Sequence, residues 1–329
     1  MSPKLREEAL ERRARRLQEV LPEAEALMHA CAACGHACGA DRKAGARGRC
    51  HVESADPRSV RYASATLHFG EEPVLVGRGG SGTVFLSRCN LCCVFCQNHQ
   101  ISQEGLGRDV QAEDLADVFL DMQAQGAENV NLVTPTHYFY PILLALNMAC
   151  SRGLALPIVY NTNGYDSLTL LTLLDGIVDI YLPDLKYMDE GNALRYSAAP
   201  GYSTVAKAAL QEMYRQVGSV ELEHGAARKG LLIRHLVLPD DISGSYEALL
   251  WLKDAGLTEA TIGLMSQYSP QYRAREYPEL LRRLHPKEYR DFVEYAEKLG
   301  FEHVLTQSLA STEHYLPDFR RRDPFRSYA

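Results

Sequence analysis

The sequence predicts an α/β fold: a partial (β/α)6 TIM-like barrel with an N-terminal helix and a cysteine-rich metal-binding extension. Two observations support the barrel. Short apolar segments alternate with amphipathic helical segments from about residue 83 to residue 306, and the apolar segments are continuous, as in parallel strands that are buried on both faces. A third observation supports the extension, since eight of the nine cysteines fall in two tight clusters near the first predicted strand.

The predicted elements alternate in chain order. We expect strands at residues 83–87, 129–134, 156–161, 176–182, 231–238 and 258–265, and a last strand within 301–306. We expect helices at residues 4–30, 113–125, 141–152, 166–174, 205–217, 245–255 and 286–299. This order divides the chain into an extension over residues 1–70, a barrel over 71–310 and a tail over 311–329. In such a barrel, functional side chains gather where the strands end.

Composition excludes several classes of protein. The 329 residues carry 35 Lys and Arg against 42 Asp and Glu, a net charge of −7, which disfavours a general nucleic-acid binder. No apolar run reaches the roughly 18 residues that span a bilayer, and the charged N-terminal segment does not resemble a signal peptide. We therefore expect a cytoplasmic protein without a membrane partner, whose cysteines stay reduced and serve a purpose other than disulfides.

The cysteine cluster after the first predicted strand has the spacing C-x3-C-x2-C, formed by Cys89, Cys93 and Cys96. Thiolates suit iron–sulfur clusters and zinc. Three of them on one loop can hold three irons of a [4Fe-4S] cluster and leave the fourth iron open to a ligand. A structural zinc loop and an incidental cysteine-rich turn are the alternatives. We interpret the additional Cys92 as a packed thiol.

The N-terminal cysteine cluster has four members, Cys31, Cys34, Cys38 and Cys50, separated by glycines that permit sharp turns. Four thiolates suit a closed tetrahedral zinc site. They can equally ligate a second [4Fe-4S] cluster that relays electrons. A reduced loop without metal is the third reading.

The C-x3-C-x2-C spacing after the first strand resembles that of the radical S-adenosylmethionine (SAM) enzymes. The resemblance runs through most of residues 75–270 and is closest to poorly characterised homologues in the pyruvate formate-lyase activating-enzyme-like branch. It implies a [4Fe-4S] cluster that cleaves SAM reductively to a 5′-deoxyadenosyl radical, which abstracts hydrogen. It also implies a low-potential electron donor of the flavodoxin or ferredoxin type.

Four further segments carry the resemblance: Cys96-x-Asn98, the stretch 161–164, Asp184-x-Lys186 and the stretch 233–239. Where family members carry a Gly-Gly-Glu-like segment, this sequence has neither the glycine pair nor the acid. The cofactor-binding residues so implied are Asn98, Thr134, Thr136, His137, Asn161, Asn163, Asp184, Lys186 and Arg234.

The chemistry of these residue types suits SAM. Arg234 and Lys186 suit its carboxylate, Asp184 its ammonium or a ribose hydroxyl, and Asn161 and Asn163 ribose or adenine edges. For each residue alone, an ordinary polar strand end or a buried ion pair is the competing reading.

The target of the radical has three readings. Resemblance to the activases implies a protein substrate, the backbone glycine of a partner enzyme. Radical modification of a small molecule or peptide is an alternative. The third reading has no radical target, because it is a non-catalytic zinc or iron–sulfur protein.

The glycine-rich loop 77–82 lacks the lysine and the following helix of a phosphate-binding loop, so we expect a tight backbone approach near the cluster instead.

Overall fold

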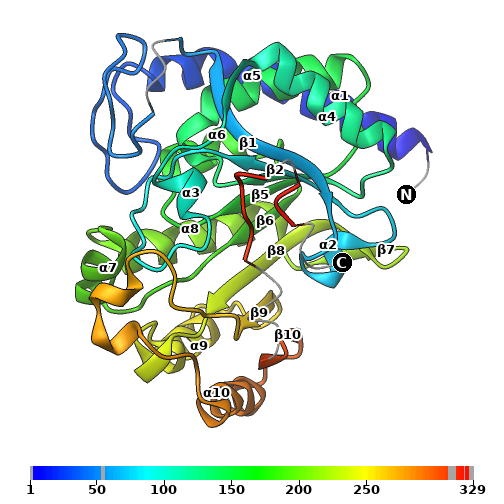
Figure 1. Ribbon diagram of the computed structural model, residues 1–329. Coiled ribbons are helices and arrows are strands. Elements are labelled where there is room, and N and C mark those ends of the chain that lie inside the picture. Colours follow the sequence, from blue (N-terminus) through cyan, green and yellow to red (C-terminus); the bar gives the residue numbers. More distant parts are fainter. Residues whose placement is uncertain (1–2, 53–55, 310–315, 322, 326–329) are drawn as a thin grey trace.

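The computed structural model describes residues 3–52, 56–309, 316–321 and 323–325. Its centre is a curved ten-stranded sheet in which the described strands follow the order β10-β9-β8-β6-β5-β4-β2-β1-β3, with β7 beside β8 (Figure 1). The strands are β1 Ser59–His68, β2 Ser81–Leu86, β3 Arg108–Gln111, β4 Val130–Val133, β5 Ile158–Thr162, β6 Ile180–Pro183, β7 Glu221–Glu223, β8 Ala226–Leu236, β9 Thr261–Met265 and β10 Val304–Thr306.

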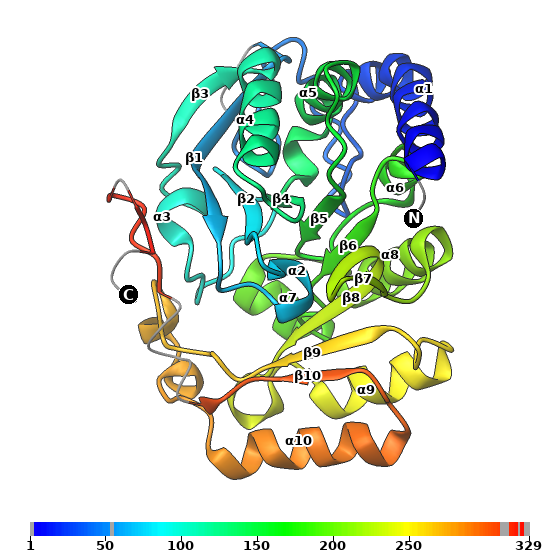
Figure 2. The ribbon, with the colours of Figure 1, turned by 90° about the vertical axis from the view of Figure 1, so that its right-hand side faces the viewer.

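Helices connect successive parallel strands and cover the convex side of the sheet (Figure 2). The α-helices are α1 Pro3–Leu27, α2 Pro73–Val76, α3 His99–Ser102, α4 Ala112–Ala124, α5 Phe139–Ser151, α6 Leu168–Leu174, α7 Glu190–Ser197, α8 Tyr202–Val217, α9 Ser245–Asp254 and α10 Pro286–Leu299. Short 3-10 turns lie at Thr136–Tyr138, Pro239–Asp241, Ala274–Glu276 and Pro278–Leu280.

The parallel part of the sheet confirms the predicted partial barrel. Strands β2, β4, β5, β6, β8, β9 and β10 pair in parallel. A helix follows each of the first six, which gives six βα units and a seventh strand. Within the described residues β10 pairs with β9 alone and β3 with β1 alone, so the sheet stays open between these two edges.

Two antiparallel strands that the sequence pattern did not predict extend the sheet beside β2. Strand β1 pairs with β2 on one side and with β3 on the other. The pairing of His68 with Ser81 places the end of β1 beside the amino end of β2. The chain therefore enters the barrel at the amino end of the parallel strands, which is the end of the sheet opposite to the cysteine loop.

The glycine-rich loop 77–82 makes the expected tight approach, but its predicted location near the cluster is wrong. A Cβ on Gly79 would lie 1.9 Å from the carbonyl oxygen of Gly126, and one on Gly82 would lie 2.6 Å from that of Asn129. These contacts are at the amino end of β2, whereas Cys89 follows its carboxyl end. These glycines allow the chain to pack closely at the amino end of the parallel strands.

Helix α2 lies within the curve of the sheet (Figure 2). Its Leu75 is fully buried and packs with the inward-facing Val159, Ile180, Leu182 and Leu232 of β5, β6 and β8. The two residues before this helix are consequently held inside the barrel. No helix among the described residues has both the length and the apolar character that crossing a membrane requires.

Candidate active site

The loop between β2 and α3 carries Cys89, Cys93 and Cys96 at the carboxyl end of the first parallel strand. The three thiols influence one another electrostatically, since Cys93 acts on both of the others. Burial, reinforced by Cys93, raises the pKa of the Cys89 thiol and raises that of Cys96 to about 11. The structure therefore places the three predicted ligands on one loop, near enough to influence one another's charge, where negative charge needs compensation.

Each of these sulfurs has a hydrogen-bond donor or hydroxyl beside it. The amide N–H of Leu91 donates to Cys89 Sγ at 3.3 Å. Ser197 Oγ donates to Cys93 Sγ at 3.0 Å, and Ser102 Oγ lies 3.3 Å from Cys96 Sγ. Donors to thiolate sulfur stabilise its negative charge, as in iron–sulfur proteins, where they help to set the reduction potential. Sequence reasoning missed both serines. Ser197 is distant in sequence from the cysteine motif, and Ser102 follows the motif without being part of it.

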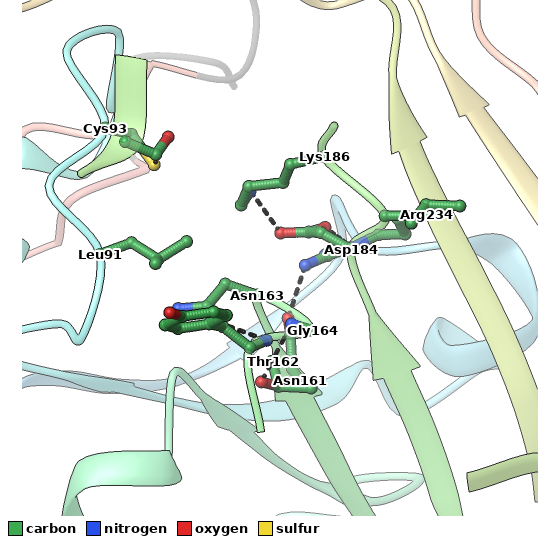
Figure 3. A network of polar contacts seen from close by, with 12 residues as sticks. Leu91, Cys93, Asn161, Thr162, Asn163, Gly164, Asp184, Lys186 and Arg234 are labelled. Atoms are coloured by element: carbon green, nitrogen blue, oxygen red, sulfur yellow. Dashed lines mark hydrogen bonds and ion pairs between the residues drawn. The ribbon is translucent and has the colours of Figure 1, made fainter. Parts of the chain in front are cut away.

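A buried ion-pair network lies at the ends of the next strands. Asp184, directly after β6, accepts from Lys186 Nζ at 2.7 Å and from Arg234 Nε of β8 at 2.9 Å. Arg234 Nη2 also donates to Asn161 Oδ1 at 2.6 Å. Figure 3 shows Asp184 between the two cations, with Asn161 at the end of the neighbouring strand. The structure thus joins four of the residues predicted to bind SAM.

The pKa values in this network follow from opposing effects. Burial alone would raise the pKa of Asp184, but Arg234 and Lys186 outweigh it and hold that pKa below its ordinary value. Burial would lower the pKa of Lys186, yet Asp184 and the thiol of Cys93 raise it. All three groups therefore stay charged near neutral pH, and Lys186 links the network electrostatically to the cysteine loop.

Asn163 connects the end of β5 to the cysteine loop. Its Nδ2 donates to Asn90 Oδ1 at 2.6 Å and lies 3.5 Å from Cys89 Sγ, while its Oδ1 accepts from the amide of Tyr165 at 3.1 Å. Asn98 is the residue before α3 and lines the cleft described below. Thr134, after β4, has a φ of 58° and donates its amide to the carbonyl oxygen of Asn161 at 2.7 Å.

Thr136 and His137 lie beside the N-terminal cysteines. Thr136 Oγ1 donates to the buried Asp166 at 2.7 Å, and His137 Nε2 lies 2.9 Å from the carbonyl oxygen of Ser87. Burial lowers the pKa of His137 to about 3, so its ring is neutral. Both residues line the cysteine cavity rather than the cleft, and their assignment to SAM stays a prediction.

The four N-terminal cysteines line a small cavity of about 20 Å³. Its other walls include Arg42, whose Nη1 lies 4.0 Å from Cys31 Sγ, and Asn90 of the loop between β2 and α3. Burial raises the pKa of Cys34 to about 12, and Asn90 hydrogen-bonds to this thiol. The extension therefore packs directly against the loop that carries Cys89.

No three His, Cys, Asp or Glu side chains in the described part of the chain converge as ligands of one metal ion would. Over the same residues all nine cysteines are free of disulfides. The ligand roles of the two cysteine sets consequently stay predictions that rest on residue type, loop and surroundings.

A cleft with a volume of about 650 Å³ is lined in part by Leu305 and Thr306 of β10. Its lining includes Gln97 and Asn98, which follow Cys96, and also Glu71, Glu72 and Arg234. Residues of β9, β10 and the tail form its walls. Sequence reasoning missed the two glutamates, because adjacent acids in a loop are mostly solvent-exposed and nothing local signals that α2 carries them inside the barrel.

Comparison with known proteins gives two matches that decide the family. A model of the radical SAM superfamily matches residues 83–216, which include the cysteine loop, Asn161, Asp184 and Lys186 but not Arg234. The uncharacterized protein MJ0674 of Methanocaldococcus jannaschii is 31% identical over 281 residues, which cover 83% of this chain and 75% of that protein. The chain belongs to the radical SAM superfamily.

Solved structures show a more distant likeness to this radical SAM chain. Streptococcus suis SuiB bound to S-adenosylmethionine is 13% identical with a TM-score of 0.47, and the match covers 68% of this chain and 50% of SuiB. Methylornithine synthase (PylB) is also 13% identical, with a TM-score of 0.44 and coverage of 73% and 77%. This chain therefore spans about half the length of SuiB. Superfamily membership makes it a SAM-dependent enzyme of radical chemistry that uses a [4Fe-4S] cluster.

Proposed function

We propose that Cys89, Cys93 and Cys96 hold the [4Fe-4S] cluster and that the cleft beside them holds SAM and a substrate from which hydrogen is abstracted. The observation that carries this proposal is the position of the three thiols. They lie on one buried loop, each beside an N–H or O–H group, and they influence Lys186 of the neighbouring ion-pair network. When bound, the cluster supplies the electron that cleaves SAM to methionine and a 5′-deoxyadenosyl radical.

The ion-pair network supplies the groups that bind the methionine end of SAM. Among the described residues Lys186 Nζ contacts one acceptor, Asp184 Oδ2, so two of its three protons stay available for a carboxylate. Arg234 is held by Asp184 and Asn161 through Nε and Nη2, which fixes the orientation of its guanidinium. Asp184 thus positions both cations and keeps them charged.

Direct tests are the iron and acid-labile sulfide content and the formation of 5′-deoxyadenosine by anaerobically purified protein under strong reductant. We expect about four irons with matching sulfide at this site, and loss of product in Cys93→Ala. Cys92→Ala is the matched control, since Cys92 lies in the same loop, and its backbone N–H, which the substitution keeps, donates to Ser197. Full product formation by Cys93→Ala would overturn the ligand assignment.

A second candidate concerns the target of the radical, a backbone glycine of a partner enzyme. The open edge between β10 and β3 favours it, because an open sheet leaves room for a segment of another protein beside the cleft. Incubating the reduced protein and SAM with a candidate glycyl-radical enzyme should produce a glycyl-radical EPR signal. A signal absent from every such partner, with SAM cleavage intact, would favour a small molecule or peptide instead.

The N-terminal cysteines support a second metal, and their surroundings favour a single ion. A cavity of about 20 Å³ has room for one or two atoms of water size, which suits zinc better than four irons and four sulfides. We expect about one zinc per chain, and loss of that zinc in Cys34→Ala with the iron unchanged. Eight irons per chain without zinc would contradict this proposal and indicate a second cluster.

A further inference from the structure

The two glutamates before α2 are held rigidly inside the barrel. Glu72 precedes Pro73, the first residue of the helix, and Leu75 anchors that helix in the core between β5, β6 and β8. Both carboxylates line the 650 Å³ cleft that reaches Asn98 at the cysteine loop. The pair therefore occupies a fixed position on the wall of the cavity that the radical chemistry uses.

One oxygen of the Glu72 carboxyl group has no hydrogen-bond partner among the described residues, although the Glu72 side chain hydrogen-bonds that of Glu71. This oxygen, Oε2, is buried. Glu71 is 10% exposed at the side chain, and its Oε2 lies 3.9 Å from Arg234 Nη1, too far for a hydrogen bond. Buried polar atoms are nearly always paired, so an orphaned carboxylate oxygen on a cleft wall indicates a missing donor.

The charges around the pair do not balance. Among the described residues three carboxylates, those of Glu71, Glu72 and Asp184, lie near two cations, and both cations bond to Asp184. His68, which also lines the cleft, does not compensate, because burial lowers the pKa of its ring. Burial, opposed by Arg234 and reinforced by Glu71, raises the pKa of Glu72 to about 7. Without a ligand the site thus balances its charge by keeping a proton.

We propose that Glu71 and Glu72 bind an ammonium or guanidinium group of the radical substrate. A cation placed there supplies the donor that Glu72 Oε2 lacks and the positive charge that the three carboxylates lack. Asn98, two residues after Cys96, lines the same cleft as the two glutamates, and the volume of the cleft is typical of ligand sites. The chemical class is a free alkylamine or alkylguanidine, or the side chain of Lys or Arg in a peptide. The statement that this cation belongs to the radical substrate rests on the proposed function. The statement that a cation binds to Glu71 and Glu72 does not.

The test measures binding by calorimetry to the full, cluster-loaded protein with saturating SAM. The probes are n-pentylamine and n-pentylguanidine, with 1-pentanol and pentanoate as the neutral and anionic counterparts. We expect one of the cations to bind at least tenfold more tightly than the alcohol, and pentanoate not to bind. Acetyl-lysine-amide and acetyl-arginine-amide, compared with acetyl-norleucine-amide, form the second arm, which separates a peptide side chain from a free amine.

Proton release gives a readout that a merely structural role of the glutamates would not produce. Titration in two buffers of different ionisation enthalpy should show nearly one proton released per cation bound at pH 6 and little release at pH 8. Glu72→Gln should abolish both the binding and the release, and Glu247→Gln, an exposed glutamate of α9, should keep them. Glu71→Gln is the second variant if Glu72→Gln does not fold.

Two results would overturn the inference: equal affinity for pentylamine and pentanol in the wild-type protein, or cation binding that SAM competes away. The second result would assign the glutamates to SAM itself. Formation of 5′-deoxyadenosine is measured on the same preparation, so a protein that cleaves SAM but binds no cation refutes this inference alone. One that binds the cation but cleaves no SAM refutes the proposed function.

Discussion

Replacing Glu72 with Gln should stabilise the protein, and the gain should depend on pH. Gln has the shape of Glu without the charge that is buried beside Glu71. The pKa of Glu72 is about 7 in the folded chain against an ordinary value of 4.5. At 1.36 kcal/mol per pH unit, this interval corresponds to at most about 3 kcal/mol of lost stability when Glu72 is fully ionised.

The sign follows from proton linkage. Because the folded pKa is raised, the folded chain binds more protons than the unfolded chain between pH 4.5 and about 7, and stability falls as pH rises through that window. Glu72→Gln removes this loss. Its advantage over the wild type should therefore be small at pH 4.5 and grow by about 2 kcal/mol between pH 5.5 and pH 8.

Anaerobic urea unfolding of the loaded protein measures the difference, followed by the fluorescence of Trp251, the single tryptophan. Glu247→Gln is the matched control and should change the free energy of unfolding by less than about 0.5 kcal/mol at every pH. A Glu72→Gln variant that is less stable than the wild type at pH 8, or whose effect is the same at pH 5.5 and pH 8, would refute the unpaired buried carboxylate.

Three further predictions address the network, the cluster and the fold. Asp184→Asn leaves two buried cations without their carboxylate and should lower the free energy of urea unfolding by about 3 kcal/mol. The control Asp117→Asn removes an exposed ion pair with Arg152 and should lower it by less than about 1 kcal/mol. Equal losses would contradict the network. Ser197→Ala removes the donor to Cys93 Sγ and should lower the cluster's reduction potential by on the order of tens of millivolts in a redox titration. Tyr187→Phe, which removes only the hydroxyl bonded to Ser197, should leave that potential unchanged, and a shift in both or in neither would count against the sulfur contact. Gly79→Ala brings a Cβ onto the Gly126 carbonyl oxygen and should lower the free energy of unfolding by about 2–3 kcal/mol. Gly263→Ala, whose Cβ would have its nearest atoms at 3.8 Å, should be tolerated. A Gly79→Ala variant as stable as the wild type would show that the loop packs differently.

The parallel strands and the cysteine loop could be predicted because their signals are local. Each parallel strand is a short apolar run, and the C-x3-C-x2-C spacing directly follows one of them, so the sheet places those cysteines at its carboxyl end. Asp184 and Lys186 lie just beyond a predicted strand. Arg234 lies inside the predicted strand 231–238, and the structure places it near the carboxyl end of β8. Their meeting at one edge follows from the parallel order of the strands.

The parts that sequence reasoning missed depend on contacts between distant segments. Strand β1 mixes small, polar and apolar residues without clear alternation, and it is a strand because β2 and β3 pair with it on both sides. The burial of Glu71 and Glu72 depends on the position of α2 within the curve of the sheet. No pattern in the sequence around the two glutamates indicates that position. Thr136 and His137 follow β4 as expected, but the extension packs against them and takes them out of the cleft.

The most direct test of the radical SAM assignment to Cys89, Cys93 and Cys96 is the EPR spectrum of the reduced protein before and after SAM is added. A cluster held by three cysteines has an open iron, and SAM bound there should change the spectrum of the wild type and of Cys92→Ala. A reduced [4Fe-4S] signal that SAM leaves unchanged, in protein with intact iron and sulfide, would contradict an open iron and with it the account given above.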